Sequence, residues 1–454
     1  MSGSVPAMFH VGPVGGLSPG GQLRKQLETA SAVVRPETAF VSLTVEVPAL
    51  NPAGLLDALP GEPVVAYAET IGLGVAAELR LDLLDAAAAR TWLRRIGATI
   101  AGREAPSIFC GAAFAPEATG KGRWRDFPAL LLMLPRWTYL ADWTIATLTL
   151  TLPVAHLGDR SREDEALAEL DRIVTCLEAA SPEHATPAKA PRQMSPADWE
   201  TLVRGALREI GVGRFQKLVL ARTAIVEAGE PWRREAIFRR IGSAAATTPF
   251  AVGFGATTFL GASPEMLVSS GPQGHFATHA LAATIPAGAD ATALTRSHKN
   301  REEHRLVVDE IVRRLRPLCS ELDVASEPAV VQLRDVAHLQ TPISGRRKDG
   351  IDVLDLAYAI HPTPAVGGLP GRPAVDWICS HEPEPRGWYA GFLGWLDGSG
   401  AGRLGVAIRS GLISGREACL YTGAGIVAGS DPAAEYEETS WKQRPFLRAL
   451  GLEA

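Results

Sequence analysis

Two ionisable side chains at the ends of apolar, strand-like segments are candidates for proton transfer. Lys217 precedes the apolar run 218–221, and desolvation at such a place can lower the pKa of a lysine enough to make it a general base. Glu265 follows Pro264 at a turn between apolar runs, where a carboxyl group can stay protonated and act as a general acid. Taken singly, each residue has a simpler interpretation: the lysine extends from a strand end to solvent, and the glutamate is exposed at a turn. Together they are typical of push–pull acid–base catalysis.

Three glutamates on two predicted helices are candidates for holding a divalent metal ion. Glu303 lies near the apolar side of a helix predicted for residues 302–318. Glu435 and Glu438 share a face of a helix that starts at Asp431-Pro432, an acidic cap followed by proline at the first helical position. A carboxylate that points inward needs a partner, and Mg²⁺ takes one or two carboxylates together with water and substrate oxygens. The alternative is charged helix flanks at the surface.

Residues 405–442 also carry groups that suit an anion. Arg409 ends one strand-like run, and Gly423 and Gly425 follow the next one. The glycines are predicted to form a loop whose backbone N–H groups approach an anion closely. Lys442 lies one helical turn beyond the second acidic residue of the terminal helix. The combination suits a small anionic ligand held with a divalent metal, and the alternative is an acidic surface helix after a tight turn.

Composition and charge exclude several classes of protein. The chain has 454 residues and a formal net charge of -5, which argues against nucleic-acid binding because that requires a basic patch. No apolar run reaches transmembrane length, and the N-terminus does not have the pattern of a secretory signal. The five cysteines include no CxxC pair, so neither a disulfide framework nor a zinc site is expected. We expect a cytoplasmic monomer with neither nucleic acid nor a membrane as partner.

Strand-like and helical segments mix along the chain, which predicts an α+β architecture with large, mostly antiparallel sheets. Residues 1–21 are predicted to be a flexible lead, and 181–192 a linker. They delimit an N-terminal half, 22–192, and a second region, 193–454, which we expect to form one compact domain overall. The elements expected to position the candidate side chains are helices at 195–210, 302–318, 353–360 and from 431 on, and extended segments at 218–225, 258–260, 265–269, 330–339 and 387–396.

Nine short segments between residues 214 and 442 carry a resemblance to a known family. They are FQKLVLAR, FLGASPE, the REEH helix, AHLQT, HPTPAVGGLP, GWYAGFLGW, VAIRSGLI, TGAGIVAGSDP and AEYEET followed by Lys442. In this order they resemble the chorismate-utilising enzymes, and within them the isochorismate synthases. The resemblance implies two large antiparallel sheets that face each other, with helices on the outside and the active site between them.

The resemblance also implies roles for the candidate residues. Lys217 would activate a water molecule that attacks C2 of chorismate, and Glu265 would protonate the departing C4 hydroxyl. Glu303 and Glu438 would hold Mg²⁺, with Glu435 close by. The groups that would hold the pyruvyl carboxylate are Tyr389, Arg409, Gly423 and Gly425, and Lys442 would lie near the ring carboxylate. The ring pocket would be lined by His338 and Thr341, and Thr284 would also bind the substrate.

The chain departs from the resemblance in one segment, 281–287. The family usually has Leu-Ala-Gly-Thr/Ser followed by basic residues, whereas here Ala283 replaces the glycine, and Ile285 and Ala287 replace the basic residues. The added methyl stands where the backbone normally approaches the ligand. Three hypotheses follow: a Mg²⁺-dependent isochorismate synthase for siderophore or menaquinone biosynthesis, a salicylate synthase that also eliminates pyruvate, and a chorismate-binding protein with weak or lost catalysis.

Overall fold

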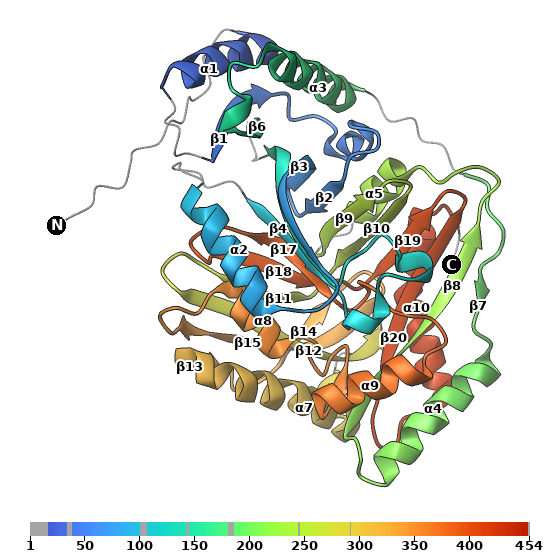
Figure 1. Cartoon of the computed structure of the whole chain (residues 1–454). Coiled ribbons are helices and arrows are strands. Elements are labelled where there is room, and N and C mark those ends of the chain that lie inside the picture. Colours follow the sequence, from blue (N-terminus) through green and yellow to red (C-terminus); the bar gives the residue numbers. More distant parts are fainter. Residues whose placement is uncertain are drawn as a thin grey trace.

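Two antiparallel sheets that share one long strand form the framework of the protein (Figure 1). The computed structural model describes residues 17–33, 39–99, 107–141, 145–179, 186–243, 246–290 and 292–452. The shared strand is β5 (Leu130–Ala141), which pairs along one edge with β3 (Thr70–Leu81). On the other edge, the first half of β5 pairs with β4 (Ile108–Ala112) and the second half with β6 (Ala146–Pro153). The strand network therefore branches at β5.

Each branch continues as a sheet, and every strand pairing in the described ranges is antiparallel. From β5, the first sheet extends in one direction through β6 to β1 (Phe40–Val47). In the other direction the order is β3, β2 (Val64–Tyr67), β9 (Thr248–Phe254), β10 (Thr257–Ser263), β19 (Ser410–Ser414), β20 (Glu417–Ile426) and β8 (Lys217–Glu227). Strand β8 also pairs with the two short strands β7 (Arg192–Gln193) and β16 (Gly368–Leu369). The second extends through β4, β17 (Phe392–Leu396), β18 (Gly402–Val406), β11 (Met266–Ser270), β12 (His275–Pro286) and β15 (Val336–Arg347), which also pairs with β13 (Cys319–Val324) and β14 (Ala329–Gln332). Because β2 pairs with β9 and β4 with β17, the N-terminal half contributes strands to both sheets.

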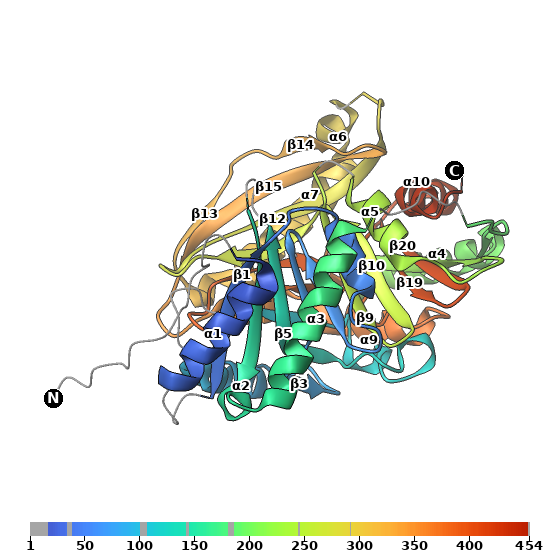
Figure 2. The ribbon, with the colours of Figure 1, turned by 90° about the horizontal axis from the view of Figure 1, so that it is seen from above.

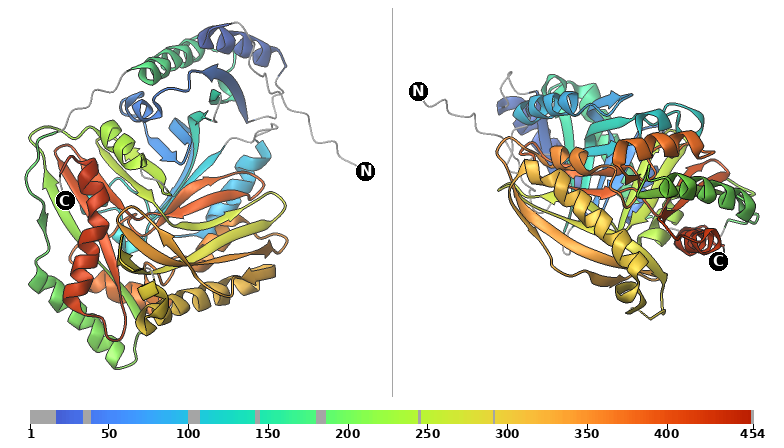
Figure 3. Two further views of the ribbon diagram at one scale, coloured as in Figure 1. Left: turned by 180° about the vertical axis from the view of Figure 1, so that it is seen from behind. Right: turned by 90° about the horizontal axis from the view of Figure 1, so that it is seen from below.

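Helices cover the outer faces of the sheets, as Figures 2 and 3 show. The helices α1 (Pro19–Val33) and α3 (Arg160–Glu178) lie together over β1, α7 (His298–Leu315) packs along β12, and α10 (Pro432–Ala449) along β20. The other helices are α2 (Ala86–Thr99), α4 (Pro196–Gly211), α5 (Arg234–Gly242), α6 (Thr292–Arg296), α8 (Val353–Ile360) and α9 (Gly371–His381). This arrangement confirms the expected α+β fold. Within the described segments, no helix is both long and apolar enough to cross a lipid bilayer.

Apolar side chains fill two regions of the interior. One lies between the sheets and the other under α1, α3 and α5. All seven residues of β10 are buried, because helices or the facing sheet cover both faces of this strand. Strands of this kind have continuous apolar runs in place of an alternating pattern. Each fully buried Leu, Ile, Val or Phe side chain contributes roughly 1.5–3 kcal/mol, so this packing holds the two sheets at a fixed separation.

Two helix starts were predicted correctly from their capping residues. The Ser195 hydroxyl accepts a hydrogen bond from the N–H of Asp198 at 3.1 Å at the start of α4. The Asp431 carboxylate accepts one from the N–H of Ala434 at 2.9 Å at the start of α10. In both helices proline occupies the first position, where no N–H donor is needed. The second of these caps fixes the helix that carries the acidic candidates.

Two extended segments were predicted incorrectly. Residues 330–339 form two strands, because the chain reverses at 333–335, where the N–H of Leu333 donates to the carbonyl of Val336 at 2.8 Å. The reversal contains neither glycine nor proline, and Asp335 is its one turn-favouring residue, so the turn signal in the sequence is weak. The strand predicted for 387–396 begins only at Phe392, since Gly387 and Ala390 have φ values of 55° and 62° and turn the chain.

The flexible lead predicted for residues 1–21 extends too far toward the C-terminus. Helix α1 begins at Pro19, inside the segment 1–21. The first 16 residues lie outside the described residues, as do 181–185 of the predicted linker.

Candidate active site

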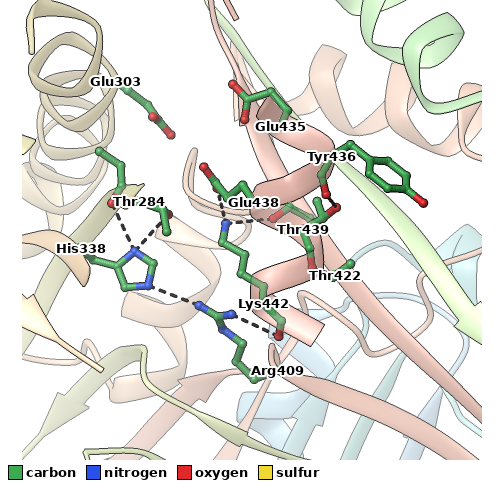
Figure 4. A network of polar contacts seen from close by, with 12 residues as sticks. Thr284, Glu303, His338, Arg409, Thr422, Glu435, Tyr436, Glu438, Thr439 and Lys442 are labelled. Carbon is green, nitrogen blue, oxygen red and sulfur yellow. Dashed lines mark hydrogen bonds and ion pairs between the residues drawn. The ribbon is translucent and has the colours of Figure 1, made fainter. Parts of the chain in front are cut away.

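A cavity of about 80 Å³ lies between the two sheets and is lined by most of the predicted site residues (Figure 4). Strands β8 and β20 of the first sheet and β12 and β15 of the second form its walls, and α7 and α10 close it. The predicted residues that line it are Lys217, Glu265, Thr284, Glu303, His338, Tyr389, Arg409, Gly423, Gly425, Glu438 and Lys442. Residues from six elements and the connecting loops thus converge on one space.

A buried ion pair lies at the centre of the cavity wall. Lys217 is the first residue of β8 and is 1% exposed, and its Nζ lies 2.9 Å from Oε1 of Glu303 on α7. Burial by itself raises the pKa of Glu303. The charge and hydrogen bond of Lys217, with Lys442 and Lys299 further away, outweigh burial and hold this pKa below its usual range. Glu303 is therefore a carboxylate, available to a cation.

The two glycines of the predicted anion-binding loop lie in a strand, so that prediction was wrong. Gly423 and Gly425 belong to β20 and pair with Ala221 and Val219 of β8. A Cβ atom at Gly425 would lie 2.6 Å from Oε1 of Glu303 and 2.9 Å from Cε of Lys217. Glycine is needed here to leave room for the ion pair.

The candidate acid lies in the short connection between β10 and β11. Glu265 is 6% exposed, and its side chain has no hydrogen-bond partner in the part of the chain that the structure describes. Burial raises the pKa of Glu265 to about 7, although the charges of Lys217, Lys442 and Arg409 act in the opposite direction. Near neutral pH a large fraction of this side chain carries a proton that it can donate into the cavity, as expected of a general acid.

A hydrogen-bond network orients Arg409 (Figure 4). Its Nη1 donates to the carbonyl of Lys442 and its Nη2 to Nε2 of His338, each at 3.3 Å. Since a guanidinium only donates, Nε2 accepts, which assigns the proton of a neutral ring to Nδ1. Nδ1 lies 3.2 Å from both the carbonyl of Ala283 and the hydroxyl of Thr284.

The histidine is neutral and is held by hydrogen bonds in the cavity wall. Burial lowers the pKa of His338 well below its ordinary value, and the charges of Arg409 and Lys442 lower it further. No carboxylate among the described residues lies within ion-pair distance of Arg409. Its φ of 55° is strained for a residue other than glycine, a feature typical of functional positions. The guanidinium is thus held ready for an anion from outside the chain.

Three lysines neutralise the three candidate metal ligands. In addition to the Lys217–Glu303 pair, Nζ of Lys299 lies 2.8 Å from Oε1 of Glu435, and Nζ of Lys442 2.6 Å from Oε1 of Glu438. Burial alone lowers the pKa of Lys299, but the combined charges of Glu435, Glu303 and Glu438 raise it, so all three carboxylates lie near this ammonium. Burial, and then the charge of Glu438, raise the pKa of Glu435.

This cluster provides oxygen ligands for a hard cation. No three His, Cys, Asp or Glu side chains in the described segments converge on a preformed metal position. Three carboxylates from α7 and α10 nevertheless offer the oxygen donors that Mg²⁺ prefers, and each one now pairs with an ammonium group that the ion would replace. The donor chemistry therefore fits Mg²⁺.

At Ala283, which replaces the glycine usual in the family, the backbone still has the conformation that glycine favours. Ala283 has a φ of 60° and stands at a β-bulge between Ala282 and Thr284, where β12 shifts register against β15. Its carbonyl faces Nδ1 of His338, and its methyl lines the cavity. The alanine therefore costs strain and some volume while it keeps the bulge that places Thr284.

Two predicted residues do not line the cavity. Thr341 lies three residues beyond His338 on β15, so their side chains point to opposite faces, and its hydroxyl lies 2.7 Å from Nε2 of His304 on α7. This places Thr341 outside the pocket that was predicted for the ring. Glu435 lies one turn before Glu438 and faces Lys299, close to the cavity and outside its lining.

Two residues of the site were missed in the sequence. Lys299 stands four residues before Glu303 on α7, and this helical spacing could have revealed a cation beside the acidic cluster. Tyr421 on β20 lines the cavity and stacks on Tyr389, with ring centroids 5.3 Å apart. Its partner is distant in the sequence, so no local pattern indicates this contact.

The fold brings Lys217, Glu265, Arg409 and the carboxylates of Glu303 and Glu438 together around one cavity between two antiparallel sheets. Residues 27–451 match the model of the family described as chorismate binding enzyme. The chain belongs to this family of chorismate-utilising enzymes.

Curated relatives and solved structures agree with the family. The chain is 37% identical over 372 residues to the salicylate biosynthesis isochorismate synthase of Pseudomonas aeruginosa, with 78% of this chain and 77% of the relative covered. It is 33% identical over 335 residues to isochorismate synthase MenF of Escherichia coli, with 71% and 75% covered. The structure of the E. coli menaquinone-specific isochorismate synthase MenF matches with a TM-score of 0.77 and 28% identity, over 95% of this chain and 99% of that one. Anthranilate synthase component I of Streptococcus pneumoniae shares the fold, with a TM-score of 0.66 at 20% identity, 84% of this chain and 92% of that one being covered.

Proposed function

We propose that the protein is an isochorismate synthase, which converts chorismate to isochorismate by adding water at C2 and releasing the C4 hydroxyl. The observation that carries the proposal is that Lys217 and Glu265, a base and an acid, line one cavity. The names of the relatives from P. aeruginosa and E. coli support the same reaction. The pathway that we propose for the product is siderophore or menaquinone biosynthesis.

The reaction needs one proton acceptor and one proton donor. As the base, Lys217 must first lose the proton that it holds in its ion pair with Glu303. The amine then takes a proton from the water whose oxygen bonds to C2, and the ring double bonds shift as the C4–O bond breaks. Glu265 gives its proton to the departing hydroxyl, which leaves as water. One water enters and one leaves, so the reaction is an isomerisation. The pKa of Glu265 near 7 supplies the protonated form at neutral pH.

The remaining cavity residues bind and orient the dianionic substrate. Arg409 is free of carboxylate partners among the described residues and would clamp the pyruvyl carboxylate, with the phenol of Tyr389 beside it. His338 fixes the guanidinium through its Nε2 acceptor. Glu303 and Glu438 would hold Mg²⁺, with Glu435 next to them, and the ion would neutralise the ring carboxylate. Lys442 would provide further positive charge near that group.

The cavity must widen before substrate can bind. Its volume of about 80 Å³ lies well below the roughly 300–1,000 Å³ of ordinary ligand pockets. The Lys442–Glu438 pair contributes both of its side chains to the lining and is partly exposed, at 15% and 17%. We propose that this pair parts when substrate binds.

One product analysis tests the proposal. The full chain is incubated with chorismate and Mg²⁺, and the products are separated by chromatography. Isochorismate alone supports the proposed function. Salicylate with pyruvate would instead establish a salicylate synthase. Unchanged chorismate with measurable binding would establish a chorismate-binding protein without catalysis, the hypothesis that Ala283 raises.

A further inference from the structure

A buried ion pair lies directly behind the wall of the candidate active site. Its members are Glu382, the residue that caps the end of α9, and Arg386, four residues later, and both side chains are 3% exposed. Nε of Arg386 lies 2.8 Å from Oε2 of Glu382, and Nη2 lies 2.5 Å from Oε1, so the two groups pair through parallel hydrogen bonds. Burial by itself lowers the pKa of Arg386, but the charge and hydrogen bond of Glu382 outweigh burial and raise it. The guanidinium is therefore charged in the interior of the protein.

Further N–H groups of Arg386 tie two segments of the cavity wall together. Nη1 donates to the carbonyl of Val366 at 2.8 Å, and Nη2 donates to the carbonyl of Val219 at 2.7 Å. Val366 belongs to the loop 361–367 between α8 and β16, whereas Val219 lies on β8, two residues beyond Lys217 and on the same face of the strand. Both valines line the cavity, and Arg386 lies behind them. One guanidinium thus spans from the loop to the strand.

The ion pair takes the place of a neighbouring strand along one edge of β8. On this edge β16 pairs only with residues 217 and 218, and β7 only with residues 224 and 225. Between them, Oε1 of Glu382 accepts a hydrogen bond from the N–H of Ala221 at 2.7 Å, and Arg386 binds the carbonyl of residue 219. Buried backbone groups need such partners, so the pair completes the sheet at a point where no strand does.

The same arginine also places Tyr389, whose ring lines the cavity. The carbonyl of Arg386 accepts a hydrogen bond from the N–H of Tyr389 at 2.9 Å. Its guanidinium carbon lies 6.0 Å from the centroid of the Tyr389 ring and 4.3 Å from the centroid of the Phe114 ring. A strand, a loop and the turn that carries Tyr389 therefore meet at one buried side chain.

We propose that Arg386 is a positioning residue that sets the spacing of the substrate pocket and places Tyr389, and that its removal weakens chorismate binding more than it slows the chemical step. The second part rests on the proposed function, in which Tyr389 lies beside the pyruvyl carboxylate. The proposed base has a support of its own, because Lys217 is held by its ion pair with Glu303. A displacement of about 1 Å in a binding site can cost roughly 10²-fold, so the loss should appear in KM.

A double variant removes the ion pair without leaving a buried charge. In Glu382→Gln/Arg386→Met the new amide oxygen can still accept from the N–H of Ala221, and an unbranched apolar chain fills the space of the arginine stem. We expect KM for chorismate to rise about tenfold or more while kcat stays within about threefold of the wild type. The affinity for chorismate measured by calorimetry should fall by the same factor as KM rises.

The matched control removes a second ion pair that lies away from the cavity. Arg136 on β5 and Glu169 on α3 are 2.8 Å apart and largely buried, at 17% and 10%, and neither lines the cavity. Arg136→Met/Glu169→Gln should therefore lower the melting temperature and leave KM unchanged. If both double variants lower stability and neither changes KM, Arg386 has a structural role only and the proposal is wrong.

Arg386→Lys separates the charge from the geometry of the guanidinium. A lysine keeps a positive charge beside Glu382, but as a point charge it cannot replace the planar fork that reaches two carbonyls and a carboxylate together. We expect this variant to be more stable than the double variant and still to have a raised KM. A wild-type KM in Arg386→Lys, or a fall in kcat at unchanged KM in either variant, would overturn the positioning role.

Crystal structures of the wild type and of the Glu382→Gln/Arg386→Met variant decide the structural part without catalysis. We expect the loop 361–367 to move away from β8 at Val366, and the ring of Tyr389 to move with it. If these segments superpose in the two structures, Arg386 does not set the spacing of the pocket. If the wild type neither binds nor turns over chorismate, the proposed function fails, while the comparison of the two structures still decides whether Arg386 positions the wall.

Discussion

Lys217 and Glu303, 86 residues apart in the sequence, form an ion pair of 2.9 Å that only a glycine at position 425 allows. One partner comes from the first residue of β8 and the other from α7, and Gly425 on the neighbouring strand β20 leaves the space in which they meet. The pair joins the proposed base to a proposed metal ligand.

Removal of the proposed base should separate catalysis from binding. Lys217→Ala should lower turnover by about 10²–10⁴-fold, the usual contribution of general base catalysis, while chorismate still binds. Turnover and calorimetric binding are measured on the same preparation. Because Lys217→Ala leaves Glu303 buried without its partner, Lys217→Gln, which keeps a hydrogen-bond donor, serves as the better-folded second variant. Retained turnover in both variants would remove Lys217 from the role of base.

A methyl group at Gly425 should disrupt the ion pair. In Gly425→Ala the new Cβ would meet Oε1 of Glu303 at 2.6 Å and Cε of Lys217 at 2.9 Å, so both side chains must shift. We expect a large loss of turnover with only a modest change in melting temperature. Gly211→Ala at the end of α4, where nothing lies within 4 Å, is the matched control and should be neutral. Equal activity of the two variants would contradict the importance of the space at Gly425.

The proposed acid should give the reaction a high-pH limit. Because burial raises the pKa of Glu265 to about 7, kcat/KM should fall as the pH rises through that value and the protonated form is lost. Glu265→Gln should remove this fall of kcat/KM at high pH, together with most of the activity. A pH profile that stays flat from pH 6 to 8 in the wild type would argue against Glu265 as the acid.

The same carboxyl group should also affect stability. Its pKa in the folded protein lies above the unfolded value of 4.5, so the folded protein binds its proton more tightly and loses stability as the pH rises from 4.5 to 7. Glu265→Gln cannot titrate, so its stability relative to the wild type should increase across this window, by on the order of 3 kcal/mol at most. Chemical denaturation at pH 5 and pH 8 measures the difference. A pH-independent difference would show that the pKa is not raised in the folded protein.

The proposed metal ligand can be compared with its neighbour in the sequence. Glu303→Gln should abolish activity and with it any response to added Mg²⁺, and treatment of the wild type with a chelator should have the same effect. Glu302→Gln is the control, since Glu302 faces solvent and pairs with Arg305 at 2.7 Å. Titration of both variants with Mg²⁺ checks the prediction. An unaltered Mg²⁺ response in Glu303→Gln would exclude Glu303 as a ligand.

The strained bulge in β12 should accept glycine. Ala283→Gly removes a side chain at a φ of 60°, so it should stabilise the fold by up to about 1 kcal/mol and keep or raise turnover. Ala287→Gly, in the same segment and outside the cavity lining, provides the comparison. Lower stability together with lower turnover in Ala283→Gly would mean that the methyl group makes a useful contact.

Much of this protein follows from local sequence. Capping residues determine where α4 and α10 begin, because Ser195 and Asp431 satisfy N–H groups within one turn of themselves. The candidates for acid, base and metal ligands were likewise chosen from residue type and spacing, and the order of the motifs indicated the family and the two-sheet fold. Interactions within a few residues suffice for these features.

Only the tertiary structure decided which groups meet. Gly423 and Gly425 were predicted to form a loop and instead lie in the last part of β20, because this strand finds its partner β8 about 200 residues earlier in the chain. Thr341 faces α7 because β15 alternates its side chains and its register with β12 is set by the bulge at Ala283. The pairing of each glutamate with a lysine from another turn or element also depends on packing. Burial, strand register and distant charges are properties of the folded chain, and they convert a set of candidate residues into one site.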